Sequence, residues 1–107
     1  MSLDVYLTAV RPVTIYDANI THNLSAMASE AGIYRHLWRP EELGIVKAAQ
    51  LIEPLRVGLA RLKADPERFR KHDAKNGWGR YEDFVPFVER YLAACEENPD
   101  ADVRVSR

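Results

Sequence analysis

The chain lacks most features that mark a specialised class of protein. It has a single cysteine, Cys95, so no disulfide can form within its 107 residues. Fifteen Lys and Arg are balanced by sixteen Asp and Glu, and without a basic excess a protein that binds nucleic acid through its overall charge is disfavoured. No apolar run approaches the roughly 18 residues of a membrane span, and the N-terminus does not resemble a signal peptide. We therefore expect a cytoplasmic protein with no membrane association.

Motifs that hold metals or activate nucleophiles are missing too. The three histidines, His22, His36 and His72, form no His-x-x-x-His pair, and there is no Cys-x-x-Cys. Zinc sites usually contain such pairs, because two ligands on one helix or knuckle fix half of the tetrahedron. No Gly-x-Ser-x-Gly elbow or phosphate-binding loop occurs. The sequence thus predicts no metal and no cofactor and leans against an enzyme, and Cys95 is expected to be a buried, inert thiol.

What is present is typical of one ordinary globular domain, which we assign to residues 1–107. Apolar residues make up 47% and charged residues 29% of the chain. Residues 3–8 alternate between apolar and polar side chains, and a second short strand is expected at 13–16 after the interruption by Arg11-Pro12. Residues 102–106 alternate as well. The N-terminal pair therefore predicts a hairpin, to which the C-terminal strand can be added as an edge.

Apolar residues recur at helical spacing in the stretches between these strands. A first helix should begin at a cap on Asn19 or Thr21 and end at Gly32. Longer helices are predicted over 47–64 and 80–97, with kinks at their internal prolines. A short helix capped by Asp65 and a loop at 73–79 should separate them. The predicted fold is α+β, a small antiparallel sheet of the N-terminal hairpin plus the C-terminal strand packed against three or four helices.

Polar side chains cluster where the hairpin is expected to give way to the first helix. The first backbone N–H groups of a helix have no intrahelical partners and its dipole adds positive potential, so an anion can bind there. Aromatic rings and glycine-flanked backbone elsewhere in the chain offer flat surfaces and close approach to such a ligand. The sequence therefore predicts a ligand-binding site made of Asn19, Thr21, His22, Asn23, Tyr34, Trp38, Arg39, Asn76 and Trp78.

Other interpretations of the same residues remain open. In a purely structural one, Thr21 caps the helix, Asn23 hydrogen-bonds the turn, His22 satisfies a backbone carbonyl, and the two tryptophans pack on the helices. In a catalytic one, His22 is the base of a small hydrolase, which needs a second acid or base such as Asp4 or Asp17. In a third, the C-terminal edge strand forms a protein interface, including one within a homo-oligomer.

Three motifs resemble a family of short uncharacterised proteins encoded by bacteriophages and prophages. They are Asn19-Ile-Thr-His-Asn-Leu, the block Tyr34…Leu37-Trp38-Arg39-Pro40, and Asn76-Gly-Trp-Gly-Arg-Tyr81. The resemblance implies a phage accessory protein in the bacterial cytoplasm, of the kind that counters host defences by binding a defence protein or sequestering a nucleotide signal. The leading hypothesis is thus a protein that binds a small anionic ligand, such as a nucleotide, without turning it over. The alternative is a module that binds or inhibits a host or phage protein, and a small hydrolase comes third.

Overall fold

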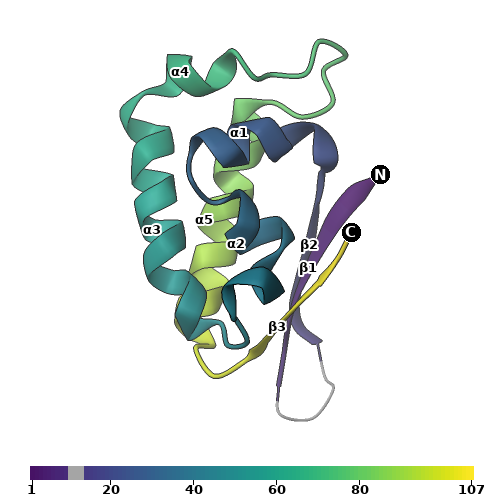
Figure 1. Cartoon of the computed structure of the whole chain (residues 1–107), viewed down its shortest axis with the longest axis vertical. Helices are drawn as coiled ribbons and strands as arrows, with labels where there is room; N and C mark the ends of the chain where they lie inside the picture. The colour runs from purple at the N-terminus through teal and green to yellow at the C-terminus, as the bar shows by residue number, and fades with distance from the viewer. Residues whose placement is uncertain (10–13) are drawn as a thin grey trace.

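Three strands form an antiparallel sheet, and the helices all lie on one side of it (Figure 1). The computed structural model describes residues 1–9 and 14–107. Its strands are β1 (Ser2–Thr8), β2 (Thr14–Thr21) and β3 (Asp102–Ser106), in the order β2-β1-β3. The α+β prediction, with a hairpin completed by the C-terminal strand, is confirmed.

The sheet follows the alternation of its side chains. Leu3, Val5 and Leu7 are fully buried beneath the helices, while the side chains between them lie on the uncovered face. The hairpin register places Leu3 opposite Ile20 and Val5 opposite Ala18, so the apolar residues of both strands share one face. Because β1 is the central strand, it carries the part of the sheet that contributes most to the core.

The predicted second strand was too short. Its expected start, Val13, lies outside the described residues, as do Arg11 and Pro12, but β2 continues to Thr21. Asp17 and Asn19 had the composition of a loop, whereas in the structure they occupy the solvent side of a strand whose other side holds Ala18 and Ile20. The polar residues that were expected just before the first helix therefore lie in strand β2.

Short helices follow β2. The 3₁₀-helix η1 (His22–Leu24) leads into α1 (Ser25–Glu30), and the predicted apolar stripe of Leu24, Met27, Ala28 and Ala31 is buried. Gly32 ends this region with a φ of +80°, as its position predicted. One helical turn, α2 (Tyr34–Trp38), follows, and the 3₁₀-helix η2 (Pro40–Leu43) begins at Pro40.

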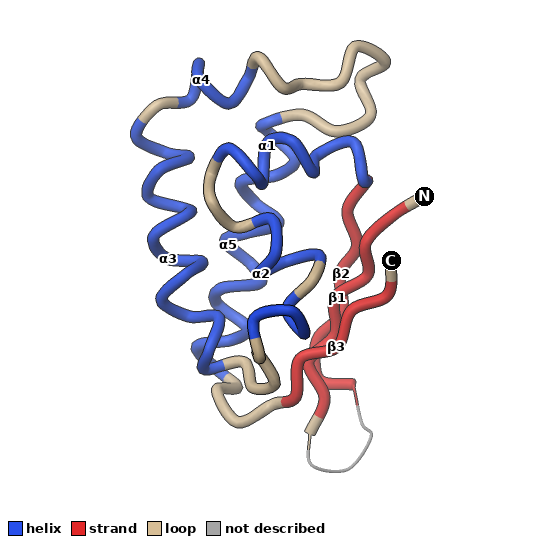
Figure 2. Tube along the Cα trace, viewed as in Figure 1, coloured by secondary structure: helices blue, strands red, loops and turns tan. Residues whose placement is uncertain are grey.

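Two long helices, α3 (Ala49–Ala64) and α5 (Tyr81–Glu97), provide most of the helical layer (Figure 2). Both run continuously through their internal prolines, Pro54 and Pro86. They are joined by the short helix α4 (Pro66–Arg70) and a loop; Asp65 precedes α4, but its side chain makes no capping hydrogen bond, so that detail of the prediction was wrong. Within the described residues, no helix is long and apolar enough to cross a membrane.

Cys95 lies in the core on α5, as predicted. Its side chain is fully buried, and burial raises the pKa of the thiol to about 12. A thiol in this environment stays protonated at neutral pH and is a poor nucleophile.

Candidate functional site

The two polar segments of the predicted site meet at one hollow. This hollow has a volume of about 650 Å³ and lies where β2 ends, between the start of β1 and the loop that precedes α5. Six of the nine predicted binding residues line it. The lining residues are Met1, Ser2, Asn19, Thr21, His22, Asn23, Asn76 and Trp78.

One hydrogen bond fixes the first segment, and a second one attaches it to the other segment. The side chain of Thr21 caps η1 by accepting a hydrogen bond from the backbone N–H of Asn23 at 3.3 Å. The amide of Asn23 in turn donates to the carbonyl oxygen of Trp78 at 2.8 Å, across 55 positions of the chain. Thr21 therefore has the capping role expected of it, whereas the side chain of Asn23 hydrogen-bonds the distant loop at Trp78 and not the local turn.

The helix start itself contributes less than we expected. η1 spans three residues and α1 six, so few aligned peptide units are available to sum to a dipole. The attraction of this hollow for a ligand therefore depends on its side chains.

His22 has an unexpected partner. The indole N–H of Trp38 donates a 2.7 Å hydrogen bond to Nδ1 of His22, where a backbone carbonyl had been the structural expectation. Since an indole nitrogen can only donate, Nδ1 is the acceptor, and the neutral imidazole carries its proton on Nε2. His22 therefore offers a lining N–H donor of defined identity.

Three predicted residues do not line the hollow. Trp38 is only 2% exposed, so it cannot form a surface for a ligand. Tyr34 stacks on Trp38 with ring centroids 5.4 Å apart, and Arg39 is paired with Glu42 at 3.4 Å. Trp38 acts on the site through His22.

Trp78 differs from Trp38 in its exposure to solvent. Its side chain is 73% exposed, yet its backbone is held on both sides. Its N–H donates to Oδ1 of Asn76 at 2.9 Å, and its carbonyl accepts from Asn23. Gly79, with a φ of +109°, lies so close to η1 that a Cβ there would be 2.8 Å from Cγ2 of Thr21. The loop thus presents the indole at the edge of the hollow from a fixed backbone.

No side chain of the described residues that line the hollow carries a formal charge, and the α-amino group of Met1, a residue that is 99% exposed, is the cation of its lining. Among the described residues that line it, none is Lys, Arg, Asp or Glu. The polar groups are the imidazole of His22, the amides of Asn19, Asn23 and Asn76, and two hydroxyls.

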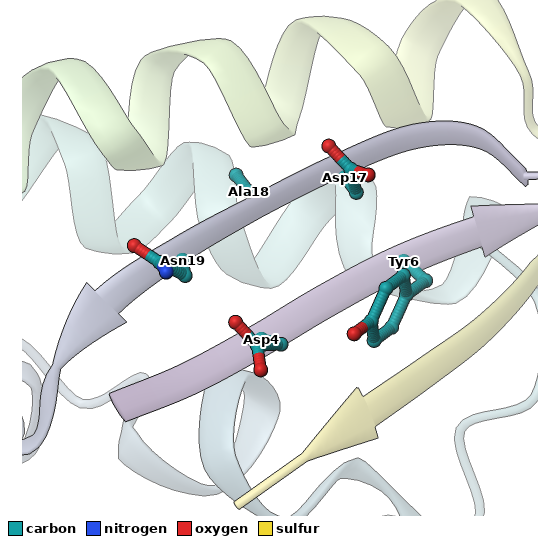
Figure 3. A pocket seen from close by; sticks show the side chains of 5 residues that line it. All are labelled: Asp4, Tyr6, Asp17, Ala18 and Asn19. Atoms are coloured by element: carbon teal, nitrogen blue, oxygen red, sulfur yellow. The ribbon is translucent and has the colours of Figure 1, made fainter. Parts of the chain in front are cut away.

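A second, smaller hollow lies on the uncovered face of the sheet (Figure 3). Its volume is about 330 Å³, and it is lined by Asp4, Tyr6, Asp17, Ala18 and Asn19. Asp4 pairs with Asn19 and Tyr6 with Asp17 across the hairpin. The two carboxylates considered as partners for His22 thus belong to another hollow, and no group of three potential metal ligands occurs in the described part of the chain.

Sequence reasoning missed two lining residues, Met1 and its neighbour Ser2. The hairpin register explains the position of Ser2, because it places this residue opposite Thr21. Extending the second strand to Thr21 is what reveals this pairing, so the signal was the continued alternation after Tyr16.

Comparison with protein-family models, curated proteins and solved structures finds no match to this chain. Its function is therefore argued from the geometry of the site, and the similarity of its motifs to phage proteins stays a prediction.

Proposed function

We propose that this protein binds a small anionic molecule, such as a nucleotide, in the 650 Å³ hollow and does not turn it over. The observation that carries the proposal is the meeting of residues 19–23 and 76–78 around a space with an exposed indole at its edge. Small-molecule sites typically have volumes of roughly 300–1,000 Å³ and few, well-placed polar groups. The hollow fits that description.

Binding without turnover is favoured by the surroundings of His22. One ring nitrogen is engaged by Trp38, and the carboxylates of Asp4 and Asp17 line the other hollow. A histidine base usually needs an acceptor that orients its ring and stabilises the imidazolium that forms. The indole N–H of Trp38 is a donor, so it cannot stabilise an imidazolium. These contacts support a role for His22 as a hydrogen-bond donor.

The resemblance of three motifs to phage-encoded proteins, which is a prediction from the sequence, suggests a biological setting for this binding. We propose a phage accessory protein of the bacterial cytoplasm that sequesters a nucleotide signal and so counters a host defence. This setting is proposed by analogy with other phage proteins, and the proposal that the hollow binds a ligand does not depend on it.

Native mass spectrometry of the protein purified gently from a bacterial host tests the binding. We expect a small-molecule adduct that is released on denaturation and that is depleted in Asn19→Ala, because Asn19 lines the hollow. Asp17→Asn is the matched control, since Asp17 lies on the same strand but outside this lining. A folded protein with a clean mass, whose thermal unfolding is unmoved by added nucleotides, would contradict the proposal.

A protein interface is the second candidate, and the exposure of Trp78 is the observation that favours it. Exposed tryptophans are rare on surfaces that bind nothing and are enriched where proteins bind each other. A stoichiometric partner captured from host lysate by the wild type, and lost with Trp78→Ala, would favour this function over ligand binding.

A further inference from the structure

We infer that the hollow recognises the planar ring of its ligand and not its charge: a heteroaromatic ring of the nucleobase class stacks on Trp78 and accepts a hydrogen bond from Nε2–H of His22. This inference deepens the proposed function and rests on it. It identifies which part of a nucleotide the protein holds.

The composition of the lining favours recognition of a ring over recognition of a charge. No charged side chain lines the hollow among the described residues, whereas sites that hold phosphate through charge use Arg or Lys. Imidazole, amide and hydroxyl groups match the neutral donors and acceptors at the edge of a base. The ribose and phosphate of a nucleotide whose base stacks on Trp78 can extend toward solvent, since Trp78 is exposed.

Trp78 is held by its backbone and leaves its indole exposed. An indole that served only to fill space would be buried, as Trp38 is. The backbone of Trp78 is instead fixed by Asn76 and Asn23, with Gly79 packed on Thr21, while its side chain stays 73% exposed. A fixed, exposed indole is a stacking platform, and stacking of one base on an aromatic side chain contributes about 5- to 150-fold in affinity.

The hydrogen bond between Trp38 and His22 has a fixed direction. Trp38 occupies Nδ1, so the imidazole presents Nε2–H. A donor of fixed identity selects a ring nitrogen or carbonyl oxygen on the ligand, both of which are acceptors on bases. Asn76 adds a donor of its own, because its Oδ1 already accepts from Trp78 and its side chain lines the same hollow.

The test compares ligands that separate ring from charge. Binding of the common nucleosides, their 5′-monophosphates and ribose 5-phosphate is measured by calorimetry and by quenching of tryptophan fluorescence. We expect at least one nucleoside to bind within about threefold of its monophosphate, with little change between about 50 and 500 mM salt, and ribose 5-phosphate not to bind. Trp78→Ala should weaken that binding by about 5- to 150-fold.

Two further variants make the result specific. Trp78→Phe retains an aromatic face and should keep affinity within about fivefold of the wild type. Val46→Ala removes another exposed apolar side chain, 59% exposed and outside the lining, and should leave affinity unchanged. Circular dichroism confirms that each variant is folded.

The outcomes separate the two claims. If monophosphates and ribose 5-phosphate bind while nucleosides do not, charge is recognised, and the inference is overturned although the proposed function stands. If none of the probes binds and the native protein carries no adduct, both are overturned.

Discussion

The indole N–H of Trp38 donates to Nδ1 of His22 at 2.7 Å, which joins a core residue directly to the wall of the hollow. Replacing Trp38 by Phe keeps an aromatic ring and removes the donor. Such a hydrogen bond contributes about 1 kcal/mol, so the preference for the Nε2–H tautomer should fall by a factor of about five. The ¹⁵N chemical shifts of the ring nitrogens at alkaline pH report the tautomer.

The same spectra contain their control. His72 contacts Glu30 and lies far from Trp38 in the chain, so its resonances should not change with Trp38→Phe. A wild-type protein in which Nδ1 of His22 carries the proton would contradict the assignment.

Gly79 should be the least replaceable glycine of the Trp78 loop. Its φ of +109° is strained for any residue with a Cβ, and that Cβ would be 2.8 Å from Thr21. Gly77 has a φ of +76°, and a Cβ added there would meet nothing within 4 Å, so Gly77→Ala measures the backbone strain alone. We expect Gly79→Ala to lower the free energy of unfolding by about 1–3 kcal/mol, and Gly77→Ala by about 1. Equal losses in urea denaturation would show that the close approach to Thr21 is not important.

Much of this fold could be predicted from the sequence because local patterns determined it. The alternation at 3–8 and 102–106 places Leu3, Val5 and Val103 on one side, and burial of that side requires the two segments to pair in a single sheet. The end of β2 escaped prediction since Asp17 and Asn19 combine strand geometry with loop-like composition. The alternation that continues from Tyr16 to Thr21 was the signal for a strand, but its polar residues were interpreted as the approach to a helix.

The site was predictable as a set of residues but not as an arrangement. Composition selected 19–23 and 76–78, whereas their meeting depends on a hydrogen bond from Asn23 to Trp78 and on Gly79 against Thr21, contacts between distant segments. Composition also could not tell the two tryptophans apart. Trp38 is buried because it follows Tyr34 by one helical turn and stacks on it.

Glu30 should make stability depend on acid pH. Its Oε2 accepts hydrogen bonds from Nη2 and Nε of Arg68 at 2.7 and 3.2 Å, and its Oε1 lies 3.3 Å from Nε2 of His72. These contacts, Arg68 first, lower the pKa of Glu30 from 4.5 to about 2. Because the folded state has the lower pKa, the stabilisation is present above about pH 4.5 and is lost as the pH falls toward 2.

The comparison of wild type with Glu30→Gln measures this effect. The wild type should be the more stable at neutral pH, and the difference in free energy of unfolding should shrink as the pH falls from about 4.5 to 2. Urea denaturation at each pH measures this difference. Glu53→Gln is the control, because the Glu53 side chain is 74% exposed and pairs with Arg56 at 3.4 Å. A constant difference across this range would exclude the contacts of Glu30 as its source.

Two tyrosines of α5 should respond in opposite ways to loss of the hydroxyl. The hydroxyl of Tyr81 donates to the carbonyl oxygen of Leu62 at 2.8 Å, whereas the buried hydroxyl of Tyr91 has no partner in the part of the chain that the structure describes. Tyr81→Phe leaves a buried carbonyl unpaired and should cost about 1–2 kcal/mol, while Tyr91→Phe removes a desolvated polar group and should be neutral or stabilise by up to about 1 kcal/mol. Both free energies come from urea denaturation at neutral pH. If Tyr91→Phe is as destabilising as Tyr81→Phe, the Tyr91 hydroxyl is hydrogen-bonded in solution, and the expectation that it is a desolvated group without a partner is wrong.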